Sequence, residues 1–206
     1  AWISDATWTG WAHELGHNLG LGHADALRCP SAPDVDLASG RAGECPIEEY
    51  GDYHDVMGAE IGTSQAPMLS AVSAAEIGLF PAGAMTTVTR TQTVTLAPLS
   101  GLTGVRAARV VDPRSGLAYV VEYRVRAGRD ADSVAAPGVR VTRMVTMGQR
   151  AGDSVVLDPT PTPGATSFAD QDRAIRPGTS LTSHTAGVSV TVVDAGATSA
   201  TVTVTV

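Results

Sequence analysis

Three histidines near the start of the chain have the spacing of metal ligands. His13 and His17 are four residues apart, so in a helix their side chains project from one face, one turn apart. Two imidazoles in that arrangement reach one tetrahedral Zn²⁺ at about 2.0–2.1 Å. Gly20 permits a sharp left-handed turn that brings His23 back to the same ion. Three neutral histidines leave a fourth position open for water, which is typical of catalytic zinc sites.

The complete segment reads H-E-x-x-H-x-x-G-x-x-H, with Glu14 beside the first histidine. Five fixed residues in eleven arise by chance about once in 10⁷ start positions. An amphipathic helix with incidental surface histidines is the alternative. It explains neither Glu14 nor Gly20 nor His23, so the sequence favours a zinc site.

A helix over residues 4–21 is expected to carry the first two histidines. Ser4 or Asp5 is the expected N-cap, because short polar side chains accept hydrogen bonds from the free backbone N–H groups of a first turn. Apolar residues recur at i, i+3, i+7 and i+11 and form one stripe along this helix. The apolar stripe comprises Trp8, Trp11, Leu15 and Leu19.

The zinc motif resembles that of the metzincin metalloproteases, which also carry a Met-turn beneath the metal. Residues 55–58, Asp-Val-Met-Gly, match that turn, with Met57 placed 34 residues after His23. Among metzincins the chain is most similar to the gametolysin family and its bacterial relatives. The resembling segments are HELGHNLGLGHA (13–24), EYGDYHDVMG (49–58), LSAVSAAEIGLFP (69–81), AYVVEYR (118–124) and GVSVTVVDAGATSATVTVTV (187–206).

Two features of metzincins have no counterpart in this sequence. Some carry a tyrosine two residues after the Met-turn methionine, as a fifth ligand or oxyanion stabiliser; here that position is Ala59, and we transfer no such role to Tyr50 or Tyr53. A metzincin catalytic domain also places a twisted sheet and a helix before the zinc helix, and an edge strand of that sheet aligns the substrate. The resemblance therefore implies a fragment that lacks the upstream catalytic sheet, against which the apolar stripe would pack.

The resemblance implies peptide hydrolysis. Zinc held by the three histidines lowers the pKa of a bound water toward about 7. Glu14 takes the proton as general base and returns it to the leaving amine after attack on the peptide carbonyl. We expect loss of Glu14 to abolish turnover while zinc is retained.

Charge divides the chain near residue 88. Residues 1–88 hold 12 acidic and 2 basic residues, whereas residues 89–206 hold 9 and 12. The second part alternates Thr or Ser with Val or Ala at 87–89, 93–95 and 199–206, as strands with one buried face do. Turn residues at 112–116 and 194–196 predict two hairpins.

The predicted class is therefore α+β. Residues 1–88 are interpreted as the C-terminal part of a metzincin-type peptidase domain. Residues 89–206 are interpreted as a β-sandwich-like domain, which either has a structural role or binds polysaccharide or cell wall.

Two cysteines, Cys29 and Cys45, lie in one stretch rich in Pro, Gly and Asp. A disulfide between them would close a loop of about 15 residues and contribute roughly 3 kcal/mol through chain entropy. An irregular loop gains most from such a bond, which favours the disulfide over two free thiols and indicates an exported protein.

Other polar residues support weaker hypotheses. An acidic cluster near the Met-turn is either a solvated loop or a Ca²⁺ site. His54 could approach the zinc, or it could be solvated or hydrogen-bonded, and His184 is expected at the surface. The acidic cluster comprises Glu44, Glu48, Glu49, Asp52 and Asp55.

Composition excludes several classes of function. A net charge of −7 argues against nucleic acid or an anionic membrane as main partner, and no apolar run approaches the 18 residues of a membrane span. The sequence favours a secreted zinc-dependent endopeptidase acting on a protein or peptide, with contact to cell wall or extracellular matrix as a further option. The alternatives are a non-hydrolytic zinc-bearing protein and a cell-wall or polysaccharide-binding protein with a vestigial protease domain.

Overall fold

A computed structural model describes residues 7–30, 32–37, 45–59, 66–146, 152–162, 164–165 and 168–206. These residues form an α+β fold rich in sheet, which confirms the predicted class at that level. In chain order the elements are α1 (Trp8–Asn18), β1 (Ala24–Leu27), β2 (Ile47–Glu48), α2 (Ala71–Glu76), β3 (Met85–Val88), β4 (Gln92–Leu96), β5 (Ala107–Val111), β6 (Ala118–Arg124), the 3₁₀ helix η2 (Gly128–Asp130), β7 (Gly138–Met144), β8 (Ser154–Val156), β9 (Ser180–Thr182), β10 (Ser189–Ala195) and β11 (Ala200–Thr205).

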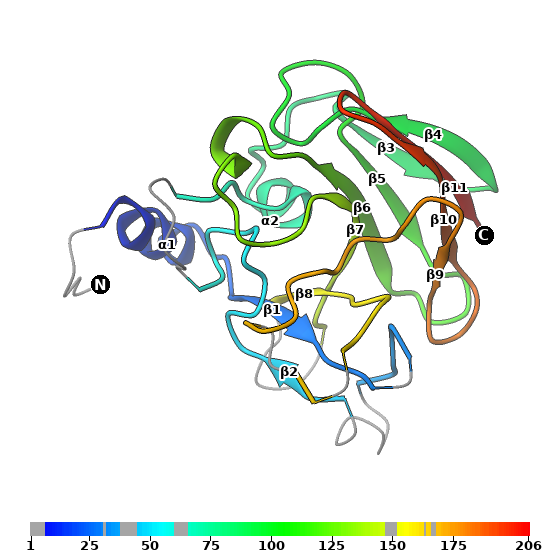
Figure 1. The fold of residues 1–206 in the computed structure, drawn as a ribbon, viewed down its shortest axis with the longest axis horizontal. Helices are drawn as coiled ribbons and strands as arrows, with labels where there is room; N and C mark the ends of the chain where they lie inside the picture. The colour runs from blue at the N-terminus through cyan, green and yellow to red at the C-terminus, as the bar shows by residue number, and fades with distance from the viewer. Residues whose placement is uncertain are drawn as a thin grey trace.

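The strands form two sheets. The larger has the order β2-β1-β8-β7-β6-β5-β3, and the smaller has the order β4-β11-β10-β9. Pairing is antiparallel except between β1 and β8 and between β3 and β5. The helix α1 lies at one side of the molecule and the smaller sheet at the other (Figure 1).

Both predicted hairpins are present. Strands β5 and β6 pair antiparallel around the turn at 112–116, where Asp112 accepts backbone hydrogen bonds from Arg114 and Ser115. Strands β10 and β11 pair antiparallel around the turn that follows Ala195. Short polar side chains and glycine thus end these strands as the sequence predicts.

The main core lies between the two sheets. In β4, β10 and β11 the valines that alternate with threonine point inward, because successive side chains of a strand face opposite sides. Val94, Val192 and Val202 of the smaller sheet are buried. They belong to one hydrophobic cluster with residues of the larger sheet such as Val110 and Val121. The two sheets thus share one apolar core, and a sandwich-like domain confined to residues 89–206 remains a prediction.

The larger sheet also includes strands from before residue 88. Strand β1 lies between β2 and β8, so a segment near residue 25 pairs with one near residue 155. The division into 1–88 and 89–206 remains a prediction, but the two parts share one sheet.

Cys29 and Cys45 form the predicted disulfide bond, and both side chains are buried in the main core. The bond joins the segment that follows β1 to the segment that precedes β2.

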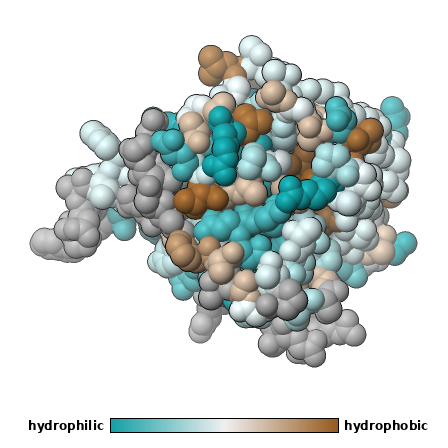
Figure 2. All heavy atoms as spheres, viewed as in Figure 1, coloured by the Kyte–Doolittle hydropathy of each residue, from teal (hydrophilic) through white to brown (hydrophobic). Residues whose placement is uncertain are grey.

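The surface mixes polar and apolar residues. On the face shown in Figure 2, a band of hydrophilic residues crosses the middle and the hydrophobic residues form separate patches. Among the described residues, no helix is long and apolar enough to cross a bilayer.

Candidate metal centre

Helix α1 fixes the relative position of the first two histidines. It begins at Trp8, and the side chain of Thr7 accepts a hydrogen bond from the backbone of Gly10 at 3.0 Å. Thr7 is therefore the N-cap; Ser4 and Asp5, the expected N-caps, lie outside the described residues.

The helix ends at Asn18, three residues earlier than predicted, and Gly20 follows with a φ of 97°. This left-handed conformation favours glycine, because a Cβ would clash with the backbone. The backbone N–H of Leu21 bonds back to the carbonyl of Gly16 at 3.0 Å and closes the turn. The chain then reverses, and His23 lies immediately before β1.

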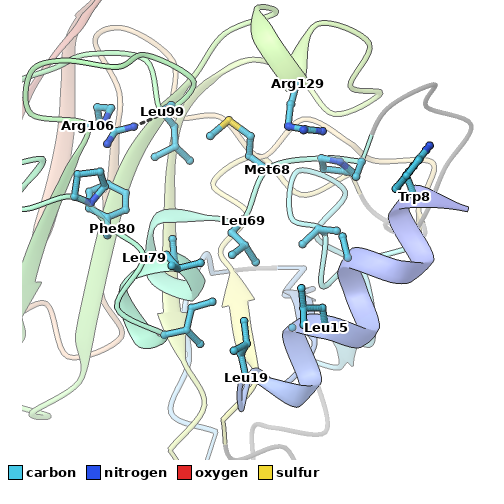
Figure 3. A pocket seen from close by; sticks show the side chains of 18 residues that line it. Trp8, Leu15, Leu19, Met68, Leu69, Leu79, Phe80, Leu99, Arg106 and Arg129 are labelled. Atoms are coloured by element: carbon cyan, nitrogen blue, oxygen red, sulfur yellow. Dashed lines mark hydrogen bonds between the residues drawn. The ribbon is translucent and has the colours of Figure 1, made fainter. Parts of the chain in front are cut away.

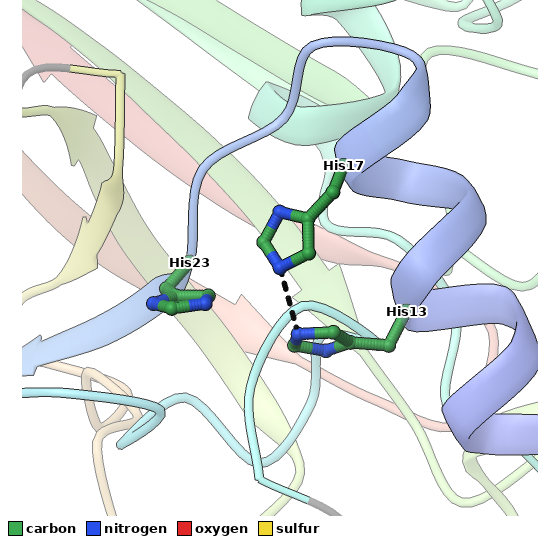
Figure 4. Close-up of side chains that lie close together, drawn as sticks. All are labelled: His13, His17 and His23. Carbon is green, nitrogen blue, oxygen red and sulfur yellow. Dashed lines mark hydrogen bonds between the residues drawn. The ribbon is translucent and has the colours of Figure 1, made fainter. Parts of the chain in front are cut away.

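The turn brings the three histidines together (Figure 4). The Nε2 atoms of His13 and His17 are 3.1 Å apart, and one nitrogen from each of the three lies within 4.8 Å of the others. Among the described residues this is the one group of His, Cys, Asp or Glu side chains with the spacing of a metal site. We call it the histidine cluster.

Hydrogen bonds to the rear nitrogens set the tautomers of the histidine cluster. The Nδ1 atoms of His13 and His17 lie 2.9 Å from the carbonyl oxygens of Val56 and Leu21, respectively. His23 Nδ1 lies 2.8 Å from a Glu49 carboxylate oxygen. Each of these oxygens can only accept, so each Nδ1 carries the proton and each Nε2 keeps its lone pair.

These lone pairs suit a cation. In the neutral tautomers two Nε2 lone pairs face each other at 3.1 Å, where they repel unless a cation lies between them. Tetrahedral zinc ligated at 2.0–2.1 Å places its nitrogens about 3.3 Å apart. Imidazole nitrogens also bind copper, iron and nickel, so the set fits a transition metal and zinc remains the prediction.

The protonation state of His13 agrees with a ligand role. Burial lowers its pKa from 6.5, and the nearby His17 and His23 lower it further. The hydrogen bond to Val56 and the charge of Glu14 act in the opposite direction. The pKa of His13 is lowered overall, and this favours the neutral imidazole that a metal requires.

The turn that contains Met57 lies against α1. Met57 is fully buried, and a Cβ on Gly16 would come within 2.3 Å of its sulfur. The Asp55 carboxylate holds this turn by accepting from the backbone N–H of Met57 at 2.9 Å and of Ser70 at 2.9 Å. The pKa of Asp55 is raised overall, because burial and the nearby charge of Asp52 outweigh the lowering effect of these hydrogen bonds. Gly16, which occupies one of the variable positions of the motif, therefore permits close approach of the methionine.

Tyr50 lies beside the cluster, although the sequence assigned it no role. Its ring centroid is 4.1 Å from that of His23 and 5.8 Å from that of His13. The residue has a φ of 60°, an unfavourable conformation for a non-glycine residue. Two hydrogen bonds hold it there, from its own N–H to buried Asp25 at 3.0 Å and from the Ala59 N–H to its carbonyl at 2.8 Å. No local sequence signal distinguishes this tyrosine from Tyr53, which is buried away from the cluster.

The acidic residues near the Met-turn are dispersed among different partners. Glu49 contacts His23, Glu48 pairs with Arg28 at 3.3 Å, and Asp52 pairs with Arg140 at 2.5 Å. Glu44 lies outside the described residues. Within the described part of the chain these carboxylates form no group with metal-ligand spacing, so the Ca²⁺ alternative gains no candidate site.

The two remaining histidines lie elsewhere. His54 is buried; its Nδ1 lies 3.0 Å from Ser133 Oγ and its Nε2 lies 3.2 Å from the carbonyl of Ala136. Of the predicted alternatives, His54 is therefore the hydrogen-bonded one, in a buried position and outside the histidine cluster. His184 was expected at the surface, but its side chain is mostly buried and contacts Asp34 at 3.1 Å.

The opposite side of α1 borders an apolar hollow of about 760 Å³ (Figure 3). Trp8, Leu15 and Leu19 line it from the helix, and Leu79 and Phe80 line it from the segment after α2. Trp8 is 84% exposed and Leu15 is 57% exposed. The apolar stripe thus remains largely uncovered, on the face of the helix away from the histidines.

Comparisons with protein-family models, curated proteins and solved structures gave no match. The resemblance to metzincins therefore remains an expectation from the residues of the motif.

Proposed function

We propose that this protein is a secreted zinc-dependent endopeptidase of the metzincin type. The observation that carries the proposal is that one nitrogen from each of the three histidines lies within 4.8 Å of the others, while the Nδ1 atom of each ring is held by a hydrogen bond. His13, His17 and His23 would hold the ion. Because imidazoles offer one lone pair each, three of them leave room for water and substrate. The disulfide supports the export part of the proposal, since such bonds persist in oxidising compartments.

Zinc, when bound, supplies Lewis-acid polarisation of a carbonyl and acidification of water. Glu14 is the base: it follows His13 directly on α1 and is close enough for its charge to raise the pKa of that imidazole. Its carboxylate accepts a proton from the attacking water, holds it, and donates it to the amine that leaves the cleaved peptide.

The surroundings of His13 leave space for a substrate. A shallow hollow of about 230 Å³ lies beside this residue, between the first turns of α1 and the segment after Met57. Its lining residues are Thr9, Gly10, His13, Tyr50, Gly58 and Ala59. Small side chains at most of these positions keep the approach to the histidine cluster open.

Zinc content and peptidase activity, measured together on three variants, test the proposal. Glu14→Gln should keep one zinc per chain and lose turnover about 10²–10⁴-fold, the usual contribution of a general base. His13→Ala should lose both. Glu76→Gln, on the exposed end of α2, is the control and should change neither.

Three results would contradict the proposal. Hydrolysis by Glu14→Gln at the wild-type rate would remove the assigned base. Absence of zinc from the wild-type chain after incubation with the metal would remove the site. Zinc uptake without hydrolysis of any peptide in a mixed library would favour the non-hydrolytic alternative.

A further inference from the structure

The third histidine has no helix to hold it. His13 and His17 keep their spacing because both belong to α1, but His23 follows the helix by five residues and a left-handed turn. The position of His23 relative to the other two must therefore come from contacts with other segments.

We infer that Asp153 is the positioning residue for His23. Its Oδ1 atom accepts a hydrogen bond from the backbone N–H of His23 at 2.8 Å, across 130 residues of sequence. The next residue, Ser154, donates its backbone N–H to the carbonyl of His23 at 2.9 Å. Both backbone polar groups of the third ligand are thus held by one dipeptide.

The anchor itself is rigid. The carbonyl of Asp153 accepts from the N–H of Val145 at 2.8 Å, directly after β7, so this hydrogen bond continues the pairing of β7 with β8 by one residue. The segment that follows His23 continues as β1, which pairs in parallel with β8 from Ala24 opposite Ser154. A displacement of His23 would therefore require breaking the β1–β8 pairing as well as the carboxylate contact.

The absence of a side chain at Gly22 is a further feature of this contact. A Cβ at this position would lie 2.3 Å from Asp153 Oδ1 and 2.8 Å from the carbonyl oxygen of Gly152. Real Cβ atoms do not approach other heavy atoms so closely. Gly22, which is not one of the fixed positions of the motif, thus allows the Asp153 carboxylate to reach the neighbouring N–H.

The inference links the metal centre to the far part of the chain. Residues that orient a metal ligand commonly affect metal affinity about 10–100-fold. We therefore expect the segment that leads into strand β8 to contribute to metal binding through Asp153, although no residue after 59 lies in the motif or its Met-turn. The inference rests on the metal-binding part of the proposed function.

Metal affinity and the absorption spectrum of the Co²⁺-substituted protein test this role, because the spectrum reports ligand geometry and does not require activity. Asp153→Ala should weaken zinc binding about 10–100-fold, measured by competition with a chelator, and should alter the cobalt bands. Asp153→Asn keeps an oxygen acceptor and should restore both. Asp112→Ala removes another hydrogen-bonded carboxylate from a turn far from the histidines and should lower stability alone.

A second variant disturbs the same hydrogen bond by a substitution next to His23. Gly22→Ala should displace the Asp153 carboxylate and reproduce the altered cobalt spectrum, and it decides the question if Asp153→Ala fails to fold. Wild-type affinity and spectrum in either folded variant would overturn the inference, as would an equal loss of affinity in Asp112→Ala. Failure of the wild-type chain itself to bind metal would instead overturn the proposed function.

Discussion

Two groups of polar side chains lie close to the Met57 turn, and they differ in charge balance. The histidine cluster combines three bases of one kind, whose ring nitrogens come within 4.8 Å of one another and which remain partly exposed. The second group, the buried charged cluster, mixes two arginines with three carboxylates and is almost fully inaccessible to solvent. The buried charged cluster comprises Asp52, Glu122, Arg124, Asp130 and Arg140.

The buried charged cluster pairs its own charges, although Asp52 Oδ2 and Arg140 Nη1 have no hydrogen-bond partner within the described residues. Arg124 bonds Glu122 at 2.7 Å and Asp130 at 3.1 Å, and the second oxygen of Glu122 accepts from the backbone N–H of Ala71 at the start of α2. Arg140 bonds Asp52, in the segment before the Met57 turn. Every cation has a nearby anion, so this cluster binds the elements to one another. It requires no ligand.

The histidine cluster contains no opposite charge that pairs with its facing Nε2 lone pairs. Its carbonyl and carboxylate partners occupy only the rear nitrogens, and the facing lone pairs have no donor between them. The comparison teaches that proximity of polar groups does not identify a binding site. The useful criterion is whether the charges of the group are balanced by partners within the group.

The largest effect is expected from breaking the charge balance of the buried charged cluster. Arg124→Met leaves Glu122 and Asp130 without their main cation in the core and should lower the free energy of unfolding by about 3–5 kcal/mol. Urea denaturation of the metal-free protein measures this loss. Arg90→Met, at an exposed position, should change stability by less than about 0.5 kcal/mol. Equal stability of the two variants would contradict the structural role of the buried charged cluster.

A smaller effect is expected at the rear of the histidine cluster. Glu49→Gln replaces the carboxylate at His23 Nδ1 with a neutral amide and should weaken zinc binding about 10–100-fold, with little change in metal-free stability. Competition with a chelator measures the affinity. Glu48→Gln alters the adjacent carboxylate, which pairs with Arg28, and should bind zinc like the wild type. If both variants behave alike, the Glu49 contact does not support the ligand.

The smallest effect concerns His54, a histidine kept neutral without a metal. Burial lowers its pKa well below 6.5, and the cations of Arg140 and Arg124 lower it further. Below pH 6.5 the unfolded chain therefore binds a proton that the folded chain does not. The stability that depends on neutral His54 is present above pH 6.5 and is lost as the pH falls below that value, by at most about 1.4 kcal/mol per pH unit.

Urea denaturation at several pH values between 7.5 and 5.5, with a chelator present, measures this dependence. His54→Gln cannot titrate, so its stability should fall less steeply with acid than that of the wild type. If the stability of both proteins depends equally on pH, His54 has the same protonation state in the folded and unfolded chain, which would contradict this prediction. The chelator removes any contribution from metal released by the histidine cluster.

Local features of this protein were predictable from sequence. The spacing of His13 and His17, the left-handed turn at Gly20 and the hairpin at 112–116 depend on interactions within a few residues, so pattern alone predicts them. The disulfide was predictable because two cysteines allow one intramolecular pairing. The start of α1 was less well predicted, because several polar residues before Trp8 are suitable N-caps.

Long-range contacts decided the rest. The burial of His54, the position of Tyr50 against His23 and the hydrogen bond from His23 to Asp153 each join segments that the chain brings together only on folding. Such contacts leave no pattern in the local sequence. For His23, the sequence alone offers several carboxylates as partners of its backbone N–H. Packing of β1 against β8 selects one of them. The sequence by itself thus determined which side chains are able to bind a metal, and the tertiary structure determined which neighbours hold them in place.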